Sequence, residues 1–370
     1  MKSKQKSKDY NEFFMRKAVQ MALKGNTLPN PFVGCVIVKN NKIIAEGFHE
    51  RHGAEHAEIN ALNKLTKNQA KNSTIFLTLE PCCHYGKTPP CIGKVIAAKP
   101  KHVVIGMKDP YPLMNGRGIK ELKKAGIKVT LGVLKKEIEY LNREYMKYAG
   151  KKEPFVYLKS AITQDGKITW ADGKNKKISG EKSRLFVHKL RNRVNAIMVG
   201  INTVLKDNPS LTTMLPKKEQ GKIIKNAGMD PYRIVLDSTL KIPLNAKVLK
   251  NDKVIIVTTK QGFSKQKARV LEKRIKRFIV FKENINLKVL MKILAKEEEI
   301  ASILIEGGAI LNTSSINSRI VDELVLLIAD FNVKEEGMEL FNKHLKKFKL
   351  TNIHSNLLDN DLVIIGKVNY

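Results

Sequence analysis

The stretch LEPCCHYGKTPPC (residues 79–91) contains three of the four cysteines in this chain of 370 residues. A chain of this length buries a large core without cross-links, whereas disulfide scaffolds are short and dense in cysteine. The uneven placement of the cysteines therefore indicates a reducing compartment and a chemical use for the cluster. We expect these residues to act as thiols rather than as disulfides.

The upstream segment GAEHAEINAL (residues 53–62) places His56 and Glu58 two residues apart. One imidazole and two thiolates form a zinc site that leaves the fourth position for water, and His56, Cys82 and Cys91 are the candidate ligands. Residues two apart diverge on a helix, so His56 should lie at a helix entrance and Glu58 in the first turn. Zinc lowers the pKa of its water to about 7. Glu58 is then the candidate to carry a proton from that water to a leaving amine.

The order H-x-E followed by P-C…C is the arrangement of zinc-dependent nucleobase deaminases. One departure is the spacing, because eight residues separate Cys82 from Cys91 where the common form has two. Successive residues point apart, so we interpret Cys83 as a bystander. An alternative is a closed structural zinc site with His84 as the fourth ligand. The position of Glu58 argues against that alternative.

The net charge of +33 arises mainly from lysines spread along the chain, and aromatic residues make up only 6%. A nucleic-acid binder concentrates its basic residues on one face. We therefore attribute the charge to a compositional drift and do not expect a nucleic-acid partner, although anionic small molecules are attracted. The N-terminus lacks the apolar stretch of a signal peptide, and no run approaches the roughly 18 apolar residues of a membrane span. These features predict a cytoplasmic protein without a membrane partner.

Alternating strand and helix patterns predict a first α/β domain over residues 1–150, with a sheet covered on both faces. Gly150 and Pro154 interrupt the helical pattern, and a strand beginning at Phe155 opens a second α/β domain over residues 151–370. The expected strands are 33–39, 42–49, 73–80, 102–107, 127–132, 195–200, 233–238, 253–259, 302–308 and 322–330. The expected helices are 54–64, one from about 91, 117–125, 135–147, 181–193 and 287–297, and a surface insertion is expected at 216–230.

Segments along nearly the whole chain resemble a known family. LPNPFVGCVIV (28–38), HAEINAL (56–62) and LEPCCHYGKTPPC resemble the deaminase domain of the bifunctional deaminase/reductase family of riboflavin biosynthesis. LKSAITQDGKI (158–168), NTVLKDNPSLT (202–212), RIVLDS (233–238) and LIEGGAILN (304–312) resemble its reductase domain. The resemblance implies a cytidine-deaminase-like three-layer α/β/α domain followed by a dihydrofolate-reductase-like α/β domain.

The resemblance also implies an activity and its cofactors. One zinc ion (Zn²⁺) per chain serves the first domain, and NADPH serves the second. The substrate is a phosphorylated, nucleotide-like pyrimidine, 2,5-diamino-6-(5-phosphoribosylamino)pyrimidin-4-one, which is deaminated before its ribosyl group is reduced to ribityl. For assembly, the resemblance leaves a homodimer and a homotetramer open.

Carried over by position, the family's zinc ligands fall on His56, Cys82 and Cys91, and its proton shuttle falls on Glu58. Positions that line the deaminase pocket fall on Asn30, His49, His84 and Lys87. Asn30 between two prolines also suits a turn, and Lys87 either is solvated or pairs with phosphate. Nicotinamide-cofactor positions fall on Ala161, Lys177, Thr203, Asp207, Ser238 and on Gly308, Ala309, Ile310, Leu311, Asn312, Thr313 and Ser314. Reductase substrate positions fall on Asn175, Arg191, Leu211, Met214 and Glu306, with Lys159 on the opening strand as a further candidate.

The reductase half departs from the family pattern at three of these positions. Asn175 replaces a usual Ser, Lys177 replaces a common cofactor-contacting Trp, and Met214 replaces a usual phosphate-binding Arg. Loss of that guanidinium removes a bidentate anchor for phosphate. These departures leave open a deaminase whose reductase half is only a scaffold. A second alternative to the bifunctional enzyme is a tRNA deaminase that uses the net positive charge of the chain to bind RNA.

Overall fold

The computed structural model describes residues 2–84, 90–168, 179–215, 230–333 and 337–370. These residues form two compact units, unit 1 within Met1–Lys152 and unit 2 from Glu153 to Tyr370. The predictions for Lys87, Asn175 and Lys177, and almost all of the expected insertion, lie outside the described residues. None of the helices in the described part of the chain is both long and apolar enough to span a lipid bilayer.

Unit 1 contains a five-stranded sheet in the order β2-β1-β3-β4-β5. The expected hairpin is confirmed: β1 and β2 pair antiparallel across Asn40 and Asn41, whose φ angles are 51° and 61°. Asparagine tolerates this left-handed conformation, which two-residue hairpin turns require. β1 also pairs antiparallel with β3, whereas β3, β4 and β5 are parallel. The strands are β1 Gly34–Lys39, β2 Lys42–Phe48, β3 Thr74–Leu79, β4 His102–Met107 and β5 Lys128–Leu131.

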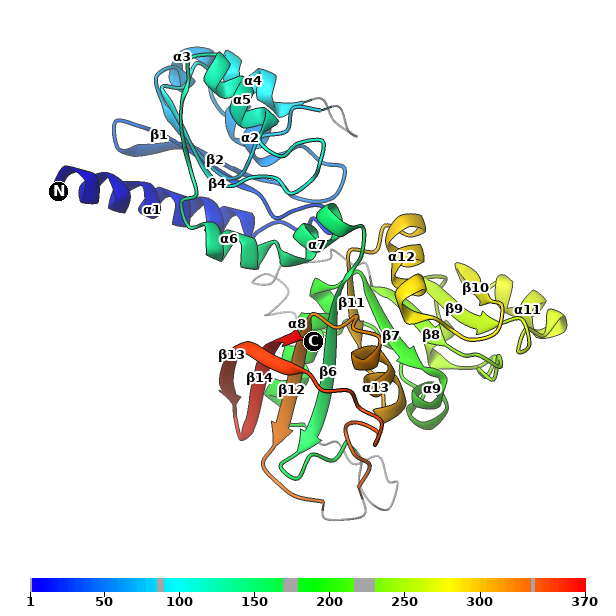
Figure 1. Ribbon diagram of the computed structural model, residues 1–370. Helices are drawn as coiled ribbons and strands as arrows, with labels where there is room; N and C mark the ends of the chain where they lie inside the picture. The colour runs from blue at the N-terminus through cyan, green and yellow to red at the C-terminus, as the bar shows by residue number, and fades with distance from the viewer. Residues whose placement is uncertain (1, 85–89, 169–178, 216–229, 334–336) are drawn as a thin grey trace. The chain divides into compact units, whose positions relative to one another are not determined.

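Helices cover both faces of this sheet (Figure 1). A Cβ atom added to Gly34 would lie 1.9 Å from the carbonyl oxygen of Ala18 on α1 (Lys2–Ala22). A Cβ atom added to Gly47 would lie 2.2 Å from the carbonyl oxygen of Ala57 on α2 (Ala57–Leu62). Gly34 pairs with Phe48, so Gly34 and Gly47 face opposite sides of the pleated hairpin. α1 and α2 therefore pack closely on opposite faces, which produces three layers.

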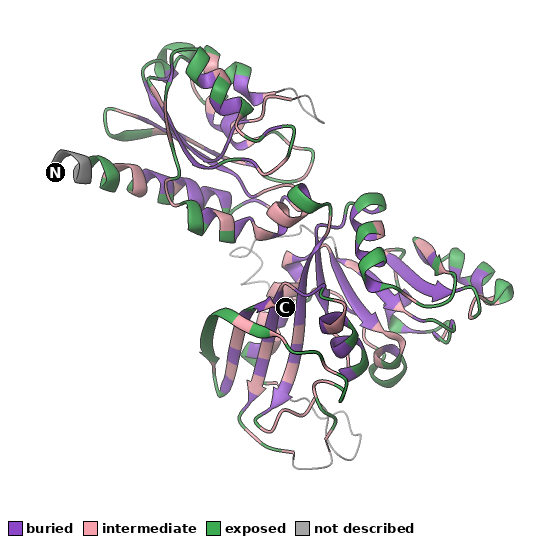
Figure 2. Cartoon of the chain, in the orientation of Figure 1, coloured by how far each residue is buried: buried purple, intermediate pink, exposed green. Residues whose placement is uncertain are grey.

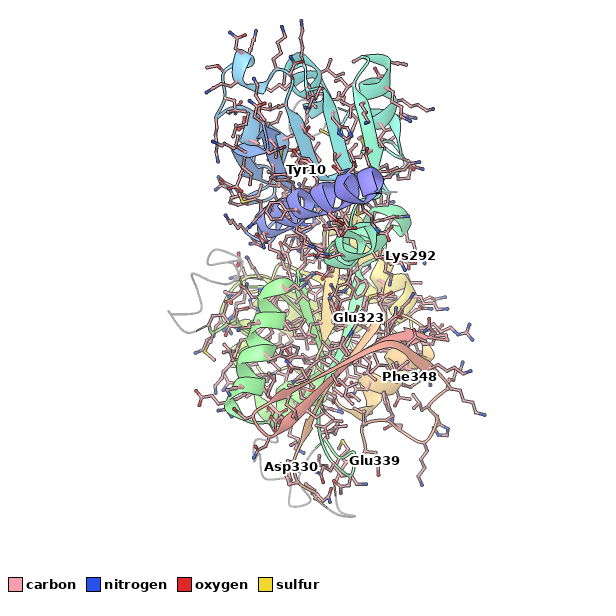
Figure 3. All side chains as sticks on the ribbon, turned by 90° about the vertical axis from the view of Figure 1, so that its left-hand side faces the viewer. Tyr10, Lys292, Glu323, Asp330, Glu339 and Phe348 are labelled. Atoms are coloured by element: carbon pink, nitrogen blue, oxygen red, sulfur yellow. The ribbon has the colours of Figure 1, made fainter. Side chains whose placement is uncertain are left out.

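The long helix α1 was not anticipated from the sequence. It carries Tyr10, labelled in Figure 3, whose ring centroid lies 6.1 Å from that of Phe76 on β3. The helix expected at 54–64 begins instead at Ala57. The other helices of unit 1 are α3 Lys67–Ala70, α4 Cys91–Ala97, α5 Arg117–Lys124, α6 Lys135–Leu141 and α7 Arg143–Lys151.

The single helix expected at 135–147 is wrong, because Asn142 separates α6 from α7. The buried Asn142 side chain accepts a hydrogen bond from the Phe32 N–H at 2.7 Å and donates one to the Phe32 carbonyl at 3.1 Å. This contact ties the break to the segment before β1. Gly150 does not interrupt the helical pattern as expected, since α7 continues through it to Lys151.

Unit 2 contains a nine-stranded sheet in the order β10-β9-β8-β7-β11-β6-β12-β14-β13. The strands from β10 to β12 are parallel, and β14 and β13 add an antiparallel edge. The strands are β6 Phe155–Thr163, β7 Ala196–Gly200, β8 Tyr232–Leu236, β9 Val254–Thr259, β10 Arg277–Phe281, β11 Ser302–Ile305, β12 Glu323–Ala329, β13 Lys349–Leu358 and β14 Asp361–Asn369.

The central strands of unit 2 are buried, whereas the edge strand β13 is largely exposed (Figure 2). The helices expected at 181–193 and 287–297 are confirmed as α8 and α12, but β10, β13, β14 and the helices α9 and α11 were missed. Because the strands from β8 to β6 are parallel, their carboxyl ends lie at one edge, where open α/β sheets bind ligands. The helices are α8 Glu181–Arg193, α9 Ile201–Asp207, α11 Lys265–Glu272, α12 Leu287–Glu297 and α13 Ala309–Asn317, with a 3-10 turn at Lys247–Leu249.

Candidate functional site

A cavity of about 310 Å³ in unit 1 is lined by six of the predicted deaminase residues: Asn30, His49, His56, Glu58, Cys82 and His84. His56 is the N-cap of α2, Glu58 lies in the first turn of that helix, and Cys91 is the first residue of α4. Cys82 follows the carboxyl end of β3, which β1 and β4 flank. The ends of one strand and two helices thus position the three candidate ligands, as their sequence context predicts.

The ligand atoms of His56, Cys82 and Cys91 all lie within 4.8 Å of one another. The Nδ1 atom of His56 is 3.1 Å from the Cys91 sulfur and 3.5 Å from the Cys82 sulfur. Ligands of a tetrahedral zinc ion are about 3.5 Å apart, so these separations fit the metal. The backbone N–H of Cys91 also donates to the Cys82 sulfur at 3.2 Å, which orients that side chain.

The electrostatics of the cluster suit a metal and an adjacent acid. The hydrogen bond from Cys91, together with the neighbouring His56, holds the pKa of the Cys82 thiol below its ordinary value. Burial raises the pKa of Glu58. The Glu58 side chain is only 3% exposed, and its Oε2 atom has no hydrogen-bond partner within the described chain. A buried carboxylate oxygen without a partner in the cavity is available to a ligand.

His49 and Asn30 form a second polar group in this cavity. The Nδ1 atom of His49 lies 3.0 Å from the Glu55 carbonyl, which only accepts, so Nδ1 carries the proton. The Nε2 atom then accepts from the Asn30 amide at 3.1 Å. Burial lowers the pKa of His49 to about 4, so the ring is neutral at pH 7. The contact supports a shared role for Asn30 and His49, although its effect on ligand binding stays a prediction.

His84 lines the cavity but stands apart from the metal cluster. Its Nδ1 atom lies 3.2 Å from the sulfur of the buried Met114, and the Cys83 sulfur lies 3.7 Å from the same atom. His84 and Cys83 are therefore directed to Met114, which does not support the closed site with His84 as fourth ligand.

Several residues of this cavity were not predicted from the sequence. Glu80, at the end of β3, is buried and accepts hydrogen bonds from the backbone N–H groups of Asp109 at 3.2 Å, Gly116 at 2.9 Å and Ile119 at 3.2 Å. Asp109 in turn accepts from the Tyr145 hydroxyl at 2.8 Å. The parallel pairing of β3 and β4 could have revealed Asp109, because residues after neighbouring parallel strands meet at one edge. No sequence signal marks the remaining missed residues Tyr111, Tyr145, Tyr148 and Lys152.

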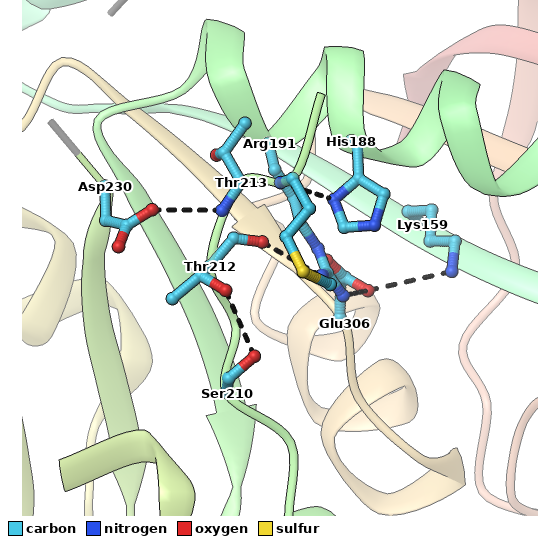
Figure 4. Close-up of polar contacts among 9 residues, drawn as sticks. Lys159, His188, Arg191, Ser210, Thr212, Thr213, Asp230 and Glu306 are labelled. Carbon is cyan, nitrogen blue, oxygen red and sulfur yellow. Dashed lines mark hydrogen bonds and ion pairs between the residues drawn. The ribbon is translucent and has the colours of Figure 1, made fainter. Parts of the chain in front are cut away.

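Unit 2 carries a buried ionic cluster (Figure 4). Arg191 of α8 donates from Nε and Nη2 to the Glu306 carboxylate at 2.6 and 2.9 Å, and Lys159 of β6 lies 3.7 Å from the same group. The three side chains are 11% to 17% exposed. Burial alone raises the pKa of Glu306, but Lys159 and Arg191 together lower it to about 2. Three predicted substrate residues thus form one charged group.

The segment that contains Leu211 and Met214 is tied to α8. The Met214 N–H donates to Nδ1 of His188 at 3.2 Å, and Arg191 donates to the Thr212 carbonyl at 3.4 Å. The Leu211 side chain is buried in the core, so any ligand contact at this position uses the backbone, whereas Met214 is 65% exposed. His188 was missed by the sequence analysis.

The predicted cofactor positions follow the strands at the carboxyl edge of the parallel sheet. Thr203 and Asp207 lie on α9 after β7, Ser238 follows β8, and Ala161 lies on β6. Gly308 caps α13 without a side-chain bond, and a Cβ atom added there would meet nothing within 4 Å. This open approach to a helix N-terminus fits the phosphates of NADPH. The side chains of Leu311, Asn312 and Thr313 are buried in unit 2, so cofactor contacts at these three positions would be through the backbone, whereas Ile310 and Ser314 are exposed.

Comparisons with known proteins cover both units. Residues 8–107 match the cytidine and deoxycytidylate deaminase zinc-binding region, and residues 154–364 match the RibD C-terminal domain. The riboflavin biosynthesis protein RibD of Aquifex aeolicus (strain VF5) is 37% identical over 97% of this chain and 99% of its own length. The RibD of Escherichia coli (strain K12) is 36% identical over 86% of this chain and 87% of its own length.

Solved structures of RibD proteins are also similar to this chain. The RibD of Acinetobacter baumannii superposes with a TM-score of 0.86 at 32% identity, covering 98% of this chain and all of that chain. A Thermotoga maritima protein described as a diaminohydroxyphosphoribosylaminopyrimidine deaminase/5-amino-6-(5-phosphoribosylamino)uracil reductase gives 0.83 at 32% identity, covering 98% and 99%. The expected deaminase-like and dihydrofolate-reductase-like folds are thereby confirmed. The chain belongs to the RibD family of riboflavin biosynthesis, whose members join a zinc-dependent deaminase to an NADPH-dependent reductase.

Proposed function

We propose that unit 1 deaminates 2,5-diamino-6-(5-phosphoribosylamino)pyrimidin-4-one and that unit 2 reduces the ribosyl group of the product to ribityl. The substrate is the one named in the description of the Thermotoga maritima relative. The observation that carries the proposal is the cluster of His56, Cys82 and Cys91 at the wall of a cavity that the buried acid Glu58 also lines. A tRNA deaminase leaves unit 2 unexplained. We also propose a cytoplasmic location, because all four cysteines are free.

His56, Cys82 and Cys91 would hold the zinc ion of unit 1. Zinc in such a site makes a water molecule acidic near neutral pH and so supplies the nucleophile. Glu58 would take one proton from the water and deliver it to the exocyclic nitrogen, which departs as ammonia. The second water proton would pass to the adjacent ring nitrogen as the ring carbon becomes a carbonyl. The neutral His49 ring accepts from the Asn30 amide and orients it, and the remaining amide groups of Asn30 offer hydrogen bonds to the pyrimidine ring.

In unit 2, Lys159, Arg191 and Glu306 orient the ribosyl substrate, and the edge formed by α9, Ser238 and Gly308 receives the cofactor. NADPH supplies the hydride. Two cations surround one carboxylate, so the cluster keeps a net positive charge that suits an anionic substrate. The departures at Asn175, Lys177 and Met214 leave the scaffold alternative to be tested by NADPH oxidation with the deaminated intermediate.

The decisive experiment measures zinc content and ammonia release in the wild type and in Glu58→Gln. We expect the variant to bind zinc normally, because Glu58 is outside the ligand cluster. Its rate of ammonia release should fall at least about 100-fold, since a general acid–base group contributes that much. Undiminished ammonia release would remove Glu58 from the mechanism. Release that falls only together with the zinc content would make Glu58 a structural residue.

A further inference from the structure

Lys152 lines the cavity of unit 1 at the end of α7. Its backbone is left-handed, with φ 55°, and its N–H donates to the Tyr148 carbonyl at 2.9 Å, which closes the last helical turn. Glycine adopts this conformation without strain, whereas a residue with a Cβ atom is disfavoured there. The backbone geometry therefore gives no reason for a lysine at this position.

Two tyrosine rings hold the Lys152 ammonium at the cavity wall. Its Nζ atom lies 5.1 Å from the centroid of Tyr111 and 5.4 Å from that of Tyr148, both within cation–π range. Tyr148 lies one turn earlier on α7, and Tyr111 follows β4, where its N–H donates to Asp109 at 2.9 Å. The Tyr111 ring also contacts the His84 ring, with centroids 5.6 Å apart. Lys152 is itself exposed, and two elements thus place aromatic rings beside its positive charge.

This charge is available to a ligand. Of the described residues that line the cavity, Lys152 is the only lysine or arginine. The ion pairs found among the described residues do not include it. Two carboxylates of the cavity have other partners, since Glu80 accepts from backbone N–H groups and Asp109 accepts from Tyr145.

We propose that Lys152, held between Tyr111 and Tyr148, binds the phosphate of the deaminase substrate and favours phosphorylated over unphosphorylated pyrimidines. This inference rests on the deaminase function proposed above. An ammonium group is a compact point charge with three donors, which suits a phosphate. The same cavity contains Glu58, so one ligand presents its ring to Glu58 and its phosphate to Lys152.

The test compares KM and kcat for ammonia release by the zinc-loaded full chain, using the diaminopyrimidine substrate with and without its 5′-phosphate. Lys152→Met keeps the aliphatic contact with the rings but removes the charge. We expect it to raise KM for the phosphorylated substrate about tenfold, as loss of a charge-assisted hydrogen bond does, with kcat unchanged. KM for the unphosphorylated substrate should stay the same. Lys152→Arg keeps the positive charge and should retain most of the affinity for the phosphorylated substrate.

Lys151→Met is the matched control, because Lys151 is exposed, adjacent and absent from the cavity lining while the change in net charge is identical. An equal rise in KM for both variants, or for both substrates with Lys152→Met, would overturn the proposal. If the wild type releases no ammonia, the proposed deaminase function fails, and titration calorimetry with ribose 5-phosphate tests Lys152 separately. Weaker binding by Lys152→Met than by Lys151→Met then supports the phosphate site, and equal binding refutes it.

Discussion

Arg191 and Glu306, 115 residues apart in the chain, form two parallel hydrogen bonds of 2.6 and 2.9 Å. The pair joins α8 to the carboxyl end of β11, and Lys159 adds a second cation from β6. Because these groups are largely buried, removal of one partner leaves the others with an uncompensated charge. The pair therefore stabilises unit 2 as well as its proposed substrate site.

Glu306→Gln should lower the free energy of unfolding of unit 2 by about 3 kcal/mol, because it leaves Lys159 and Arg191 without a counter-charge. Urea unfolding at pH 7, monitored by circular dichroism, measures the loss. Glu297→Gln is the control: the side chains of its pair with Arg277 are 35% and 47% exposed, so the pair should contribute less than about 1 kcal/mol. Equal losses in both variants would show that the buried Glu306 cluster contributes no more to the free energy of unfolding than the partly exposed pair does.

The same carboxylate predicts a pH dependence. Its pKa in the folded chain is about 2, below the ordinary 4.5, so the folded state favours the ionised form. The resulting stability is fully present above pH 4.5 and is lost as the pH falls toward 2. The difference in unfolding free energy between the wild type and Glu306→Gln should therefore shrink between pH 5 and pH 3. A difference that stays constant over this range would contradict the lowered pKa.

The two neighbouring thiols should differ in metal binding. Cys82→Ser removes a sulfur of the ligand cluster, so zinc measured by mass spectrometry should fall well below one ion per chain. Cys83→Ser changes a sulfur that faces Met114, so its zinc content and ammonia release should stay near those of the wild type. A loss of zinc in Cys83→Ser equal to that in Cys82→Ser would require a different ligand set.

Glu80→Gln should destabilise unit 1, because one amide oxygen cannot replace two carboxylate oxygens that accept three backbone N–H groups. We expect a loss of about 1–3 kcal/mol in thermal unfolding. Glu121→Gln is the control, since its pair with Lys124 is exposed. KM for the deaminase substrate should also rise, because the bonded segment carries Asp109 and Tyr111 into the cavity. Unchanged stability and KM would contradict this role.

Local patterns predicted the elements whose signals lie within a short window. The hairpin at Asn40 and Asn41 follows from turn chemistry, and α12 follows from its apolar periodicity. The division of 135–147 into two helices was missed, because the break depends on a contact between Asn142 and Phe32, 110 residues away. Gly150 was predicted to interrupt the helical pattern, but α7 continues through it to Lys151. Glycine only weakens a helix, and packing overrides that preference.

The order of His56, Glu58, Cys82 and Cys91 along the chain was enough to propose the metal chemistry, because zinc accepts few side chains and needs them in a narrow arrangement. The candidate zinc ligands can thus be identified from residue types and their order along the sequence. The position of Lys152 between two rings, and the pairing of Arg191 with Glu306, arise only when α7 and α8 pack against their sheets. Which face of a helix meets a cavity depends on contacts between residues far apart in the chain, and the folded structure alone decides it.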